Sequence, residues 1–429
     1  MTTPASAPAP AATPKLTFVL VCVFIDMLGI GLIVPVLPLL VGDFVNGREQ
    51  QALWFGILSM VFGLMQFIFM PMLGAISDRL GRRPVLMYSM AGMCINFLAT
   101  AWAPNLACLF IGRVIGGASS ASMSVASSYA SDVTTHENRA RAFGIIGAAF
   151  GLGFICGPML GGLLGSVHLH LPFYVAAALS ATNLVYGYFF VPESLPPSRR
   201  AAFAWSALNP LTALLKLLRR HDIRGLVIVY TLTTFAAMML NVTWVLYTTF
   251  RFDWTPRENG IALFCVGVCA AVVQAGMLSW LMRRFGEVRL SLLGMVSGAV
   301  AYVLYGLATQ GWMMYAVIVC NLLAFAAGPA LQAIISKKSN ASEQGELMGS
   351  LQSISSLGVI VMPLIGTSIL GAVSHLPAAD WRVGSTFFLC ALIQAAAIVV
   401  ARRTFRSHHV SMDAAISVNT EKQEHAENT

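Results

Sequence analysis

Two charged residues lie deep within apolar stretches of the sequence, Asp26 and Arg113. A charge at the centre of a lipid bilayer costs about 2.5–3.5 kcal/mol even on a lenient insertion scale, so such residues usually face a cavity or a partner. An apolar environment favours the protonated form of a carboxyl group, whereas a nearby cation favours the ionised form. A carboxyl whose access alternates between the two sides of a membrane can therefore take up a proton on one side and release it on the other.

Two interpretations of these residues stay open. Asp26 can be a proton-coupling site with Arg113 as a cation that tunes it, and this is the interpretation that we favour. Alternatively, the two side chains form a buried ion pair that only locks helices together.

The elements that position these residues must be membrane helices. Of the 429 residues, 57% are hydrophobic and 10% are charged, whereas a soluble domain carries about 25% charged residues. Apolar stretches of about 20 residues, the length that crosses the hydrocarbon core, recur along the chain. We predict an all-α membrane protein with transmembrane helices at 16–41, 52–76, 85–103, 106–131, 140–165, 172–191, 225–250, 259–282, 289–308, 311–335, 347–372 and 384–402.

The basic residues orient these twelve predicted helices. Most Lys and Arg residues fall at the two termini and in every second loop. The opposite face holds only Arg48, Arg251, Arg257 and Arg382. By the positive-inside rule both termini are cytoplasmic. The predicted organisation is a disordered N-terminus at 1–15, a six-helix bundle at 16–191, a cytoplasmic linker at 192–224, a second bundle at 225–403 and a cytoplasmic tail at 404–429.

Two landmarks recur at one offset, which indicates that the two bundles are a duplication. Gly81 and Gly286 each lie in a basic turn, and they are 205 positions apart. Pro158 and Pro363 are separated by the same 205 positions. Transporters built from repeated halves bind substrate between the halves, near the bilayer midplane, and rock around it.

Three stretches with several glycines predict particular helix geometry. The stretch from Asp26 to Pro38 holds two glycines and two prolines, which permit bending where the backbone lines a cavity. In the turn from Gly74 to Arg83, Gly74 would allow close helix approach, and Asp78 would sit at a helix N-terminus, where a carboxylate is favoured. Small residues every three or four positions from Gly147 to Gly162 favour tight helix contact in lipid.

Several other classes of function are disfavoured. No predicted strand precedes the Gly147–Gly162 stretch, so it does not predict a nucleotide site. No Lys/Arg run is interleaved with aromatic residues, so nucleic acid is not an expected partner. Cys265 and Cys269 lie one helical turn apart without further His or Cys nearby, so no metal site is expected. The predicted helices hold no Ser–His pair, His–Glu cluster or paired acids, so no enzyme activity is expected.

From about Lys15 to Arg403 the chain resembles the major facilitator superfamily, and within it the drug:proton antiporters of the tetracycline-exporter family. Four motifs carry the resemblance: Asp26 to Pro38 in helix one, Gly74 to Arg83 in the gating loop, Gly112 to Gly117 around Arg113 in helix four, and Gly153 to Gly162 in helix five. The resemblance implies the twelve-helix major facilitator fold, with two pseudo-symmetric six-helix bundles. It implies proton coupling through the helix-four motif and an export-associated helix interface through the helix-five motif.

The resemblance also assigns individual residues. The gating motif comprises Gly74, Asp78, Arg79, Gly81, Arg82 and Arg83. The antiporter motif comprises Gly153, Gly157, Pro158, Gly161 and Gly162. Charged family positions flanking the next cytoplasmic loop match Asp132 and Arg139.

The chain departs from the tetracycline exporters at three positions. Those proteins carry an acid in helix three, a His in helix eight and an acid in helix nine, where this chain has Asn96, Ala270 and Gly298. Because the acids are implicated in handling a metal–tetracycline cation and protons, we do not expect tetracycline itself as the substrate. Asp26 is then the sole membrane acid available for proton coupling.

The sequence therefore predicts a proton-coupled exporter of drug-like or amphiphilic small molecules that works by alternating access. The alternative is a carrier of one metabolite in the same fold, as a proton symporter or a uniporter. A receptor or scaffold that does not transport is disfavoured, because it would not need Asp26 in the membrane. We expect a monomer in the inner (plasma) membrane, with the proton as coupling ion and no cofactor. Candidate cavity residues are Asn96, Asn241, Trp244, Gln274 and Gln332.

Overall fold

The computed structural model describes residues 16–200, 223–337 and 344–427. The predicted disordered segment at 1–15 and most of the predicted linker at 192–224 lie outside the described residues. Within the described ranges every regular element is a helix, and no strand occurs.

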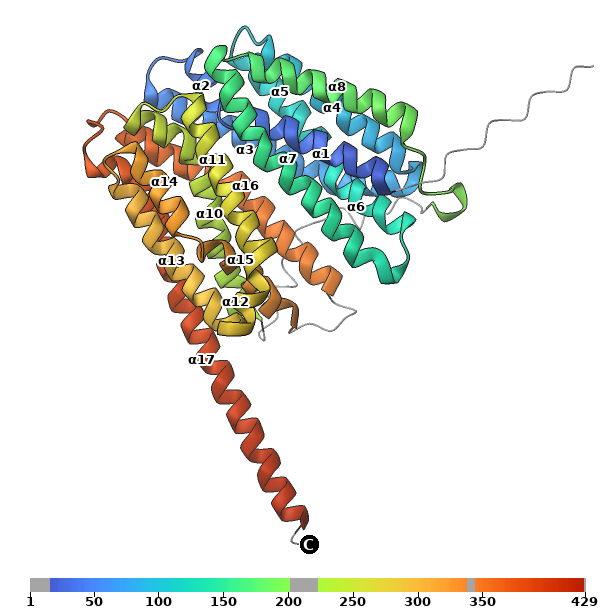
Figure 1. Ribbon diagram of the computed structural model, residues 1–429, viewed down its shortest axis with the longest axis vertical. Coiled ribbons are helices and arrows are strands. Elements are labelled where there is room, and N and C mark those ends of the chain that lie inside the picture. The colour runs from blue at the N-terminus through green and yellow to red at the C-terminus, as the bar shows by residue number, and fades with distance from the viewer. Residues whose placement is uncertain (1–15, 201–222, 338–343, 428–429) are drawn as a thin grey trace, which may run out of the picture. The chain divides into compact units, whose positions relative to one another are not determined.

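The predicted membrane spans are present (Figure 1). Among the described residues, eleven helices are long and apolar enough to cross a membrane, and a twelfth span is the pair α14 and α15, bent by 40° at its break. The α-helices are α1 (Leu16–Ile33), α2 (Leu37–Gly42), α3 (Arg48–Leu80), α4 (Arg82–Ala101), α5 (Leu106–Ser119), α6 (Ser122–Val133), α7 (Arg139–Val167), α8 (Leu171–Phe190), α10 (Arg224–Phe252), α11 (Pro256–Ala271), α12 (Leu278–Phe285), α13 (Glu287–Leu307), α14 (Gly311–Cys320), α15 (Ala324–Lys337), α16 (Gln344–Val373) and α17 (Ser385–Glu427). The prediction of an all-α membrane protein is confirmed.

Four of the spans that we predict as continuous are interrupted. The first breaks between α1 and α2 around Pro35, which has no backbone N–H to continue the helix. The Val34 N–H instead bonds the Gly31 carbonyl at 3.2 Å, so the chain makes a tight turn there. The fourth span breaks at Ser120, between α5 and α6, and the tenth breaks at Asn321, between α14 and α15. The eighth span passes through a π-helical segment, η4 (Val272–Met277), between α11 and α12.

The last helix is longer than predicted. α17 continues to Glu427, beyond the expected end at 402, so the segment that we predict as a tail is helical through 427 (Figure 1). Residues 404–427 contain neither proline nor glycine. Nothing in their sequence therefore stops a helix that the membrane span has already nucleated.

The described residues form two compact units, and each is discontinuous in sequence. One unit takes residues 16–45, 61–200 and 255–264, and the other takes 46–60, 223–254 and 265–427. Helices α3 and α11 contribute to both units, because each continues through a boundary between them. The predicted division at the linker stays a prediction.

Helix α1 of the first unit is half buried and packs against α6, α7 and α8. Its side chains Val19, Val23 and Met27 are buried in one cluster with residues of α4, α6 and α7. The contact with α7 is close because glycine faces glycine: a Cβ atom at Gly157 would lie 2.6 Å from the Cα of Gly31. Small residues permit such close packing between helices in lipid.

The small-residue stretch of α7 is in close contact along only part of its length. A Cβ atom at Gly153 would lie 2.7 Å from the Phe24 carbonyl oxygen of α1, and one at Gly162 would lie 2.9 Å from the Cα of Gly260 in α11. At Gly147 and Gly151 it would meet no atom within 4 Å. The predicted close contact is therefore confirmed for the second half of the stretch.

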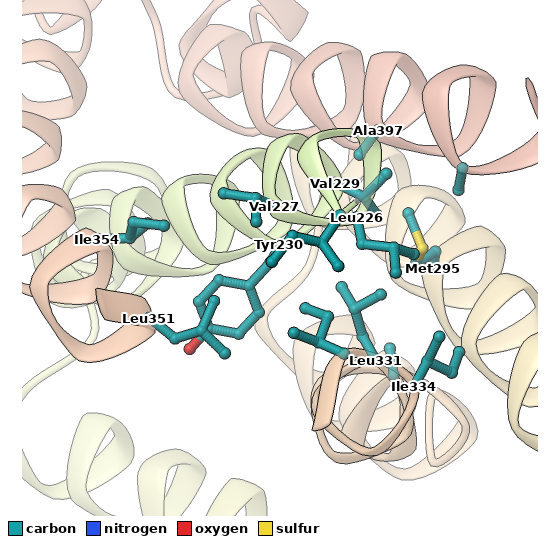
Figure 2. Close-up of a cluster of buried hydrophobic side chains, with 14 of the residues drawn as sticks. Leu226, Val227, Val229, Tyr230, Met295, Leu331, Ile334, Leu351, Ile354 and Ala397 are labelled. Atoms are coloured by element: carbon teal, nitrogen blue, oxygen red, sulfur yellow. The ribbon is translucent and has the colours of Figure 1, made fainter. Parts of the chain in front are cut away.

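Helix α10 has the matching place in the second unit and packs against α15, α16 and α17. Figure 2 shows its buried cluster, in which Leu226 and Tyr230 of α10 lie with Leu331 of α15 and Leu351 of α16. Ten of the 16 buried residues of this core are Ile, Leu or Val, and close packing fixes their side chains.

The internal repeat is visible in the backbone. Gly81 and Gly286 precede α4 and α13 with the same unusual conformation, φ 112° and ψ 163° in one and φ 71° and ψ 159° in the other. Positive φ favours glycine, which explains the residue type at both positions. Gly161 and Gly366, also 205 positions apart, lie against α1 at Leu32 and against α10 at Met239.

The Gly31–Gly157 contact generates a stability prediction. A Cβ atom at Gly31 would lie 2.8 Å from the Cα of Gly157 and 3.0 Å from Pro158 Cδ. Gly31→Ala should therefore overpack the α1–α7 contact and lower the free energy of unfolding by about 1–3 kcal/mol. We expect a melting temperature several degrees lower for the purified protein in detergent. Gly147→Ala is the control, because its Cβ meets no atom and alanine favours helix. Equal melting of the two variants would contradict the close contact.

Candidate functional site

The first unit holds the buried acid that the sequence predicts. Among the described residues, the buried charged side chains are Asp26, Arg82, Arg113 and Arg251, so Asp26 is the one carboxyl in this set. Only 3% of its surface is exposed. Burying a charge is costly unless hydrogen bonds or an opposite charge compensate for it, so the partners of Asp26 decide what it can do.

The partners of Asp26 are neutral. The amide of Asn183, in α8, donates from Nδ2 to Asp26 Oδ1 at 3.3 Å and to the Cys22 carbonyl oxygen at 3.0 Å. The hydroxyl of Ser122, in α6, donates a second hydrogen bond to the carboxyl group. Sequence reasoning missed both residues, because a lone Asn or Ser inside an apolar helix has no local pattern that links it to an acid on another helix.

The break in the fourth span explains the position of Ser122. It is the first residue of α6 and follows the interruption at Ser120 and Ala121. The first turn of any helix has N–H groups without intrahelical partners and carries the positive end of the helix dipole. The carboxyl of Asp26 therefore lies beside the positive end of the α6 dipole, which favours an anion. No cationic side chain of the described residues is bonded to this carboxyl.

Arg113 has different partners. It lies in α5, on the other side of the same break, and donates from Nη2 to Asn96 Oδ1 in α4 at 2.9 Å. Its guanidinium carbon also lies 5.4 Å from the centre of the Phe62 ring, a cation–π distance. Among the ion pairs of the described residues, none joins Asp26 to Arg113. The alternative of a buried Asp26–Arg113 pair that locks the helices is therefore wrong for this structure.

Asn96 lies where the resemblance to the tetracycline exporters implies an acid. It is fully buried, and the Cβ of a side chain at Gly116 would lie 2.7 Å from its Cγ atom. Its Nδ2 atom has no hydrogen-bond partner. Asn96 thus supplies an uncharged acceptor to Arg113, and the glycine beside it leaves room for the amide.

A second polar cluster surrounds the turn between α3 and α4. Arg82 bonds Asp78 Oδ1 at 2.5 Å, Asp132 Oδ2 at 3.0 Å and Ser77 Oγ at 2.7 Å. Asp132 also accepts from Ser194 Oγ at 2.9 Å. This cluster joins α3, α4, α6 and the segment after α8, so it ties four parts of the first unit together at one end.

Glu193 is the residue of this cluster that sequence reasoning missed. Its carboxylate accepts from the backbone N–H groups of Arg82 at 2.8 Å and Arg83 at 3.2 Å, the first two residues of α4. A Cβ atom at Gly81 would lie 2.7 Å from Glu193 Cδ, so a residue without a side chain is needed where the carboxylate meets the helix. The signal was a single acid directly after a membrane helix, opposite a basic turn.

Two predictions for the gating motif are wrong. Asp78 lies in the last turn of α3, not at a helix N-terminus; Glu193 holds the N-terminus of α4 in its place. Gly74 makes no close helix contact, because its Cβ would meet no atom within 4 Å. Of the remaining predicted charges, Arg79 is exposed, and Arg139 bonds the Ser131 carbonyl at 3.5 Å rather than the Arg82 cluster.

The predicted cavity residues of the second unit are not gathered into one site. Trp244 is buried among aromatic rings, 5.2 Å from Tyr305, and its Nε1 atom has no partner. Gln332 donates to the Tyr230 hydroxyl at 3.4 Å. Asn241 is exposed and bonds the carbonyl of its own helix.

The other positions singled out in this unit carry no charge. Gln274 is exposed within the π-helical segment η4, and such segments often mark functional positions. Ala270 lies in α11 and Gly298 in α13, at the positions where the resemblance implies a His and an acid. No group of three or more His, Cys, Asp or Glu side chains that could hold a metal ion occurs in the part of the chain that the structure describes.

The membrane spans are broken near the buried acid, and the backbone repeats itself at an offset of 205 residues. This combination is the architecture of a secondary transporter. The chain belongs to the Major Facilitator Superfamily, whose family model matches residues 19–345 and 226–418. Within that superfamily it is a tetracycline-exporter-like transporter.

The relatives support this placement over most of the chain. The chain is 38% identical over 384 residues to the class C tetracycline resistance protein of Escherichia coli, which covers 88% of this chain and 95% of the relative. It is 37% identical to the class G protein of Vibrio anguillarum, over 90% of this chain and 96% of the relative.

Solved structures show the same fold. The human organic anion transporter MFSD10 (TETRAN) aligns with a TM-score of 0.66 at 25% identity, over 90% of this chain and 98% of that one. The nucleoside transporter NupG aligns with a TM-score of 0.73 at 14% identity, over 91% and 98% of the two chains.

The Glu193 contacts generate a prediction about the turn between α3 and α4. Glu193→Gln replaces one acceptor oxygen by a donor that faces a backbone N–H, and it removes the negative charge at the N-terminus of α4. We expect the free energy of unfolding to fall by about 1–2 kcal/mol, which would be measured as a melting temperature a few degrees lower. The control is Glu137→Gln, an exposed acid in another turn of the same unit. If both variants melt together, the carboxylate does not hold α4.

Proposed function

We propose that this protein exports drug-like, amphiphilic small molecules in exchange for protons, with Asp26 as the proton carrier. The observation that carries the proposal is a carboxyl group that is 3% exposed and bonded to neutral donors, Ser122 and Asn183. A carboxyl in this setting can be neutral when it is enclosed and ionised when water reaches it. A change of exposure is therefore enough to load and unload a proton.

The separation of Asp26 from Arg113 supports this role. A carboxylate paired with a buried arginine would be held ionised throughout the cycle. Arg113 is instead held by Asn96, an amide that leaves its charge uncompensated. Asp26 is consequently free to change its protonation state without breaking an ion pair.

The close contact of α1 with α7 supports alternating access. Gly31 and Gly157 let the two backbones approach, and the breaks after Ile33 and Ser119 divide the first and fourth spans next to the acid. Irregular backbone within a membrane occurs where it is enclosed by protein or lines a cavity. These breaks give the helices that carry Asp26 and Ser122 places where they can bend.

The uncharged residues suggest the substrate class. Asn96, Ala270 and Gly298 replace ionisable residues of the tetracycline exporters, so the membrane interior has little fixed charge with which to hold a metal–tetracycline cation. We propose neutral or amphiphilic substrates, with Asp26 available to a lipophilic cation, and not tetracycline itself. The relatives are named for tetracycline resistance and for organic anion transport, which supports small organic molecules in general.

Placement and partners complete the proposal. We propose the inner membrane of a bacterium, both termini in the cytoplasm, a monomer as the working unit, and the proton in place of any cofactor. The bias of Lys and Arg toward one set of loops supports the orientation. We also propose that the chain is a carrier and not an enzyme, as expected for its superfamily.

The role of Asp26 is tested in proteoliposomes with ethidium, a lipophilic cationic dye. We expect Asp26→Asn to abolish dye accumulation driven by an imposed pH gradient, because the amide cannot carry a proton. Exchange of a labelled against an unlabelled neutral amphiphile needs neither net proton movement nor a cation bound at Asp26, and it should persist. Asp43→Asn, an exposed acid after α2, is the matched control. Undiminished gradient-driven accumulation by Asp26→Asn would reject the proposal.

The substrate class is tested by expression in a drug-sensitive bacterium. We expect resistance to lipophilic cations and neutral amphiphiles, loss of that resistance when a protonophore collapses the gradient, and no resistance to tetracycline. Resistance to none of these compounds, together with uptake of a single metabolite, would favour a metabolite carrier in the same fold. Strong tetracycline resistance would show that the acids absent at positions 96 and 298 are dispensable.

A further inference from the structure

Asn183, like Asn96, is a buried amide of the first unit that is hydrogen-bonded at one end only, and Asn183 is the one of the two that is bonded to Asp26. It is fully buried in α8. Its Nδ2 atom donates to Asp26 Oδ1 and to the Cys22 carbonyl, whereas its Oδ1 atom has no hydrogen-bond partner. Buried side-chain amides normally satisfy both ends, and an exception calls for a functional explanation.

Packing alone does not account for this amide. At Gly29 of α1 a Cβ atom would lie 3.9 Å from the Ala176 carbonyl oxygen of α8 and 3.5 Å from a Phe97 ring atom, so this part of the α1–α8 contact is made without a polar side chain. A leucine has the same number of side-chain heavy atoms and the same branching as asparagine, and it would carry no unpaired polar atom of its own. The one interaction that asparagine adds is the pair of hydrogen bonds to α1, and one of them ends on the carboxyl group.

The charged and titratable groups around Asp26 leave the amide as a main determinant of its ionisation. On α1 the neighbour is the Cys22 thiol. On α6 and α8 the titratable side chains that interact electrostatically with Cys22 are Tyr129 and Tyr186. The charged residues of α4 and α7 lie in the first turn of each helix: Arg82 and Arg83 in one, and Arg139 and Arg141 in the other. On α5, Arg113 is bonded to Asn96.

We propose that Asn183 is a positioning residue that sets the proton affinity of Asp26 by donating from its amide to the ionised carboxylate. Hydrogen bonds to the charged form of an acid favour that form. The amide therefore eases release of the proton, and its bond to the Cys22 carbonyl fixes the orientation in which it can do so. The inference deepens the proposed function and rests on Asp26 being the proton carrier.

The test is an infrared pH titration of the full-length protein in detergent. The carboxyl C=O band that appears on protonation and is missing in Asp26→Asn reports position 26 directly, without any substrate. In Asn183→Leu the carboxylate loses a donor, so its protonated form persists to higher pH. We expect the midpoint of the band to move up by about one pH unit, the size expected for one hydrogen bond to a charged group.

Two further variants make the outcome decisive. Asn183→Ala also removes the amide donor and cannot overpack the α1–α8 contact, so it should likewise move the midpoint upward; it replaces the leucine variant if that one does not fold. Ser180→Ala removes a buried hydroxyl one turn away on the same helix and should leave the midpoint unchanged. A purely structural role would lower the melting temperature in the Asn183 variants without moving the midpoint.

The possible failures can be told apart. If the wild-type band titrates and neither Asn183 variant shifts its midpoint, the role of Asn183 is overturned and that of Asp26 stands. If no band assigned to Asp26 titrates in the wild-type protein, and dye transport ignores the pH gradient, the proposed function is overturned and this inference with it.

Discussion

The protein's chemistry depends on one carboxyl group enclosed among neutral partners. Asp26 is 3% exposed, and the bonds that reach it come from an amide and a hydroxyl. Water would stabilise its ionised form strongly, and these neutral donors do so only in part. The protonation of Asp26 is consequently coupled to anything that opens or closes the space between α1, α6 and α8. Because α1 is held at glycine contacts with α7, a small helix movement can change that space.

The arginine of helix four has a separate role in this arrangement. Arg113 is bonded to Asn96 and stacked near Phe62, so its charge stays inside the first unit without neutralising Asp26. A break of the fourth span divides the two sites, with Arg113 on α5 and Ser122 on α6. A carboxylate in place of the Asn96 amide would pair with the guanidinium and compensate its charge. Here the guanidinium meets an amide, so a buried positive charge remains available.

The turn between α3 and α4 uses a different principle, because its charges are paired. Arg82 joins two carboxylates and a hydroxyl, and Glu193 accepts from the first two N–H groups of α4. The Glu193 bonds link segments that are more than a hundred residues apart in sequence. A turn that held its helices only through exposed charges would contribute little. The buried guanidinium and the helix N-terminus make this turn a specific junction.

The membrane fold follows almost entirely from the sequence. Apolar stretches of about 20 residues and the placement of basic residues determine the spans, and the shared offset of Gly81 and Gly286 reveals the repeat, since both need the same positive φ. Asp26 can also be recognised from the sequence as a candidate functional residue, because an acid inside an apolar helix is rare owing to the cost of burying its charge in the membrane.

The partners of the acid were decided only by the tertiary structure. Asn183 and Ser122 are ordinary polar residues along the chain, and packing of α6 and α8 against α1 alone brings them to the carboxyl. The same holds for Glu193, whose role depends on reaching a helix N-terminus more than a hundred positions away. Helix breaks depend on local hydrogen bonds that hydropathy does not record, so a span such as 106–131 was predicted as continuous. The sequence thus determines which groups are in the membrane, and packing determines which of them meet, because contact between distant helices leaves no periodic trace along any one of them.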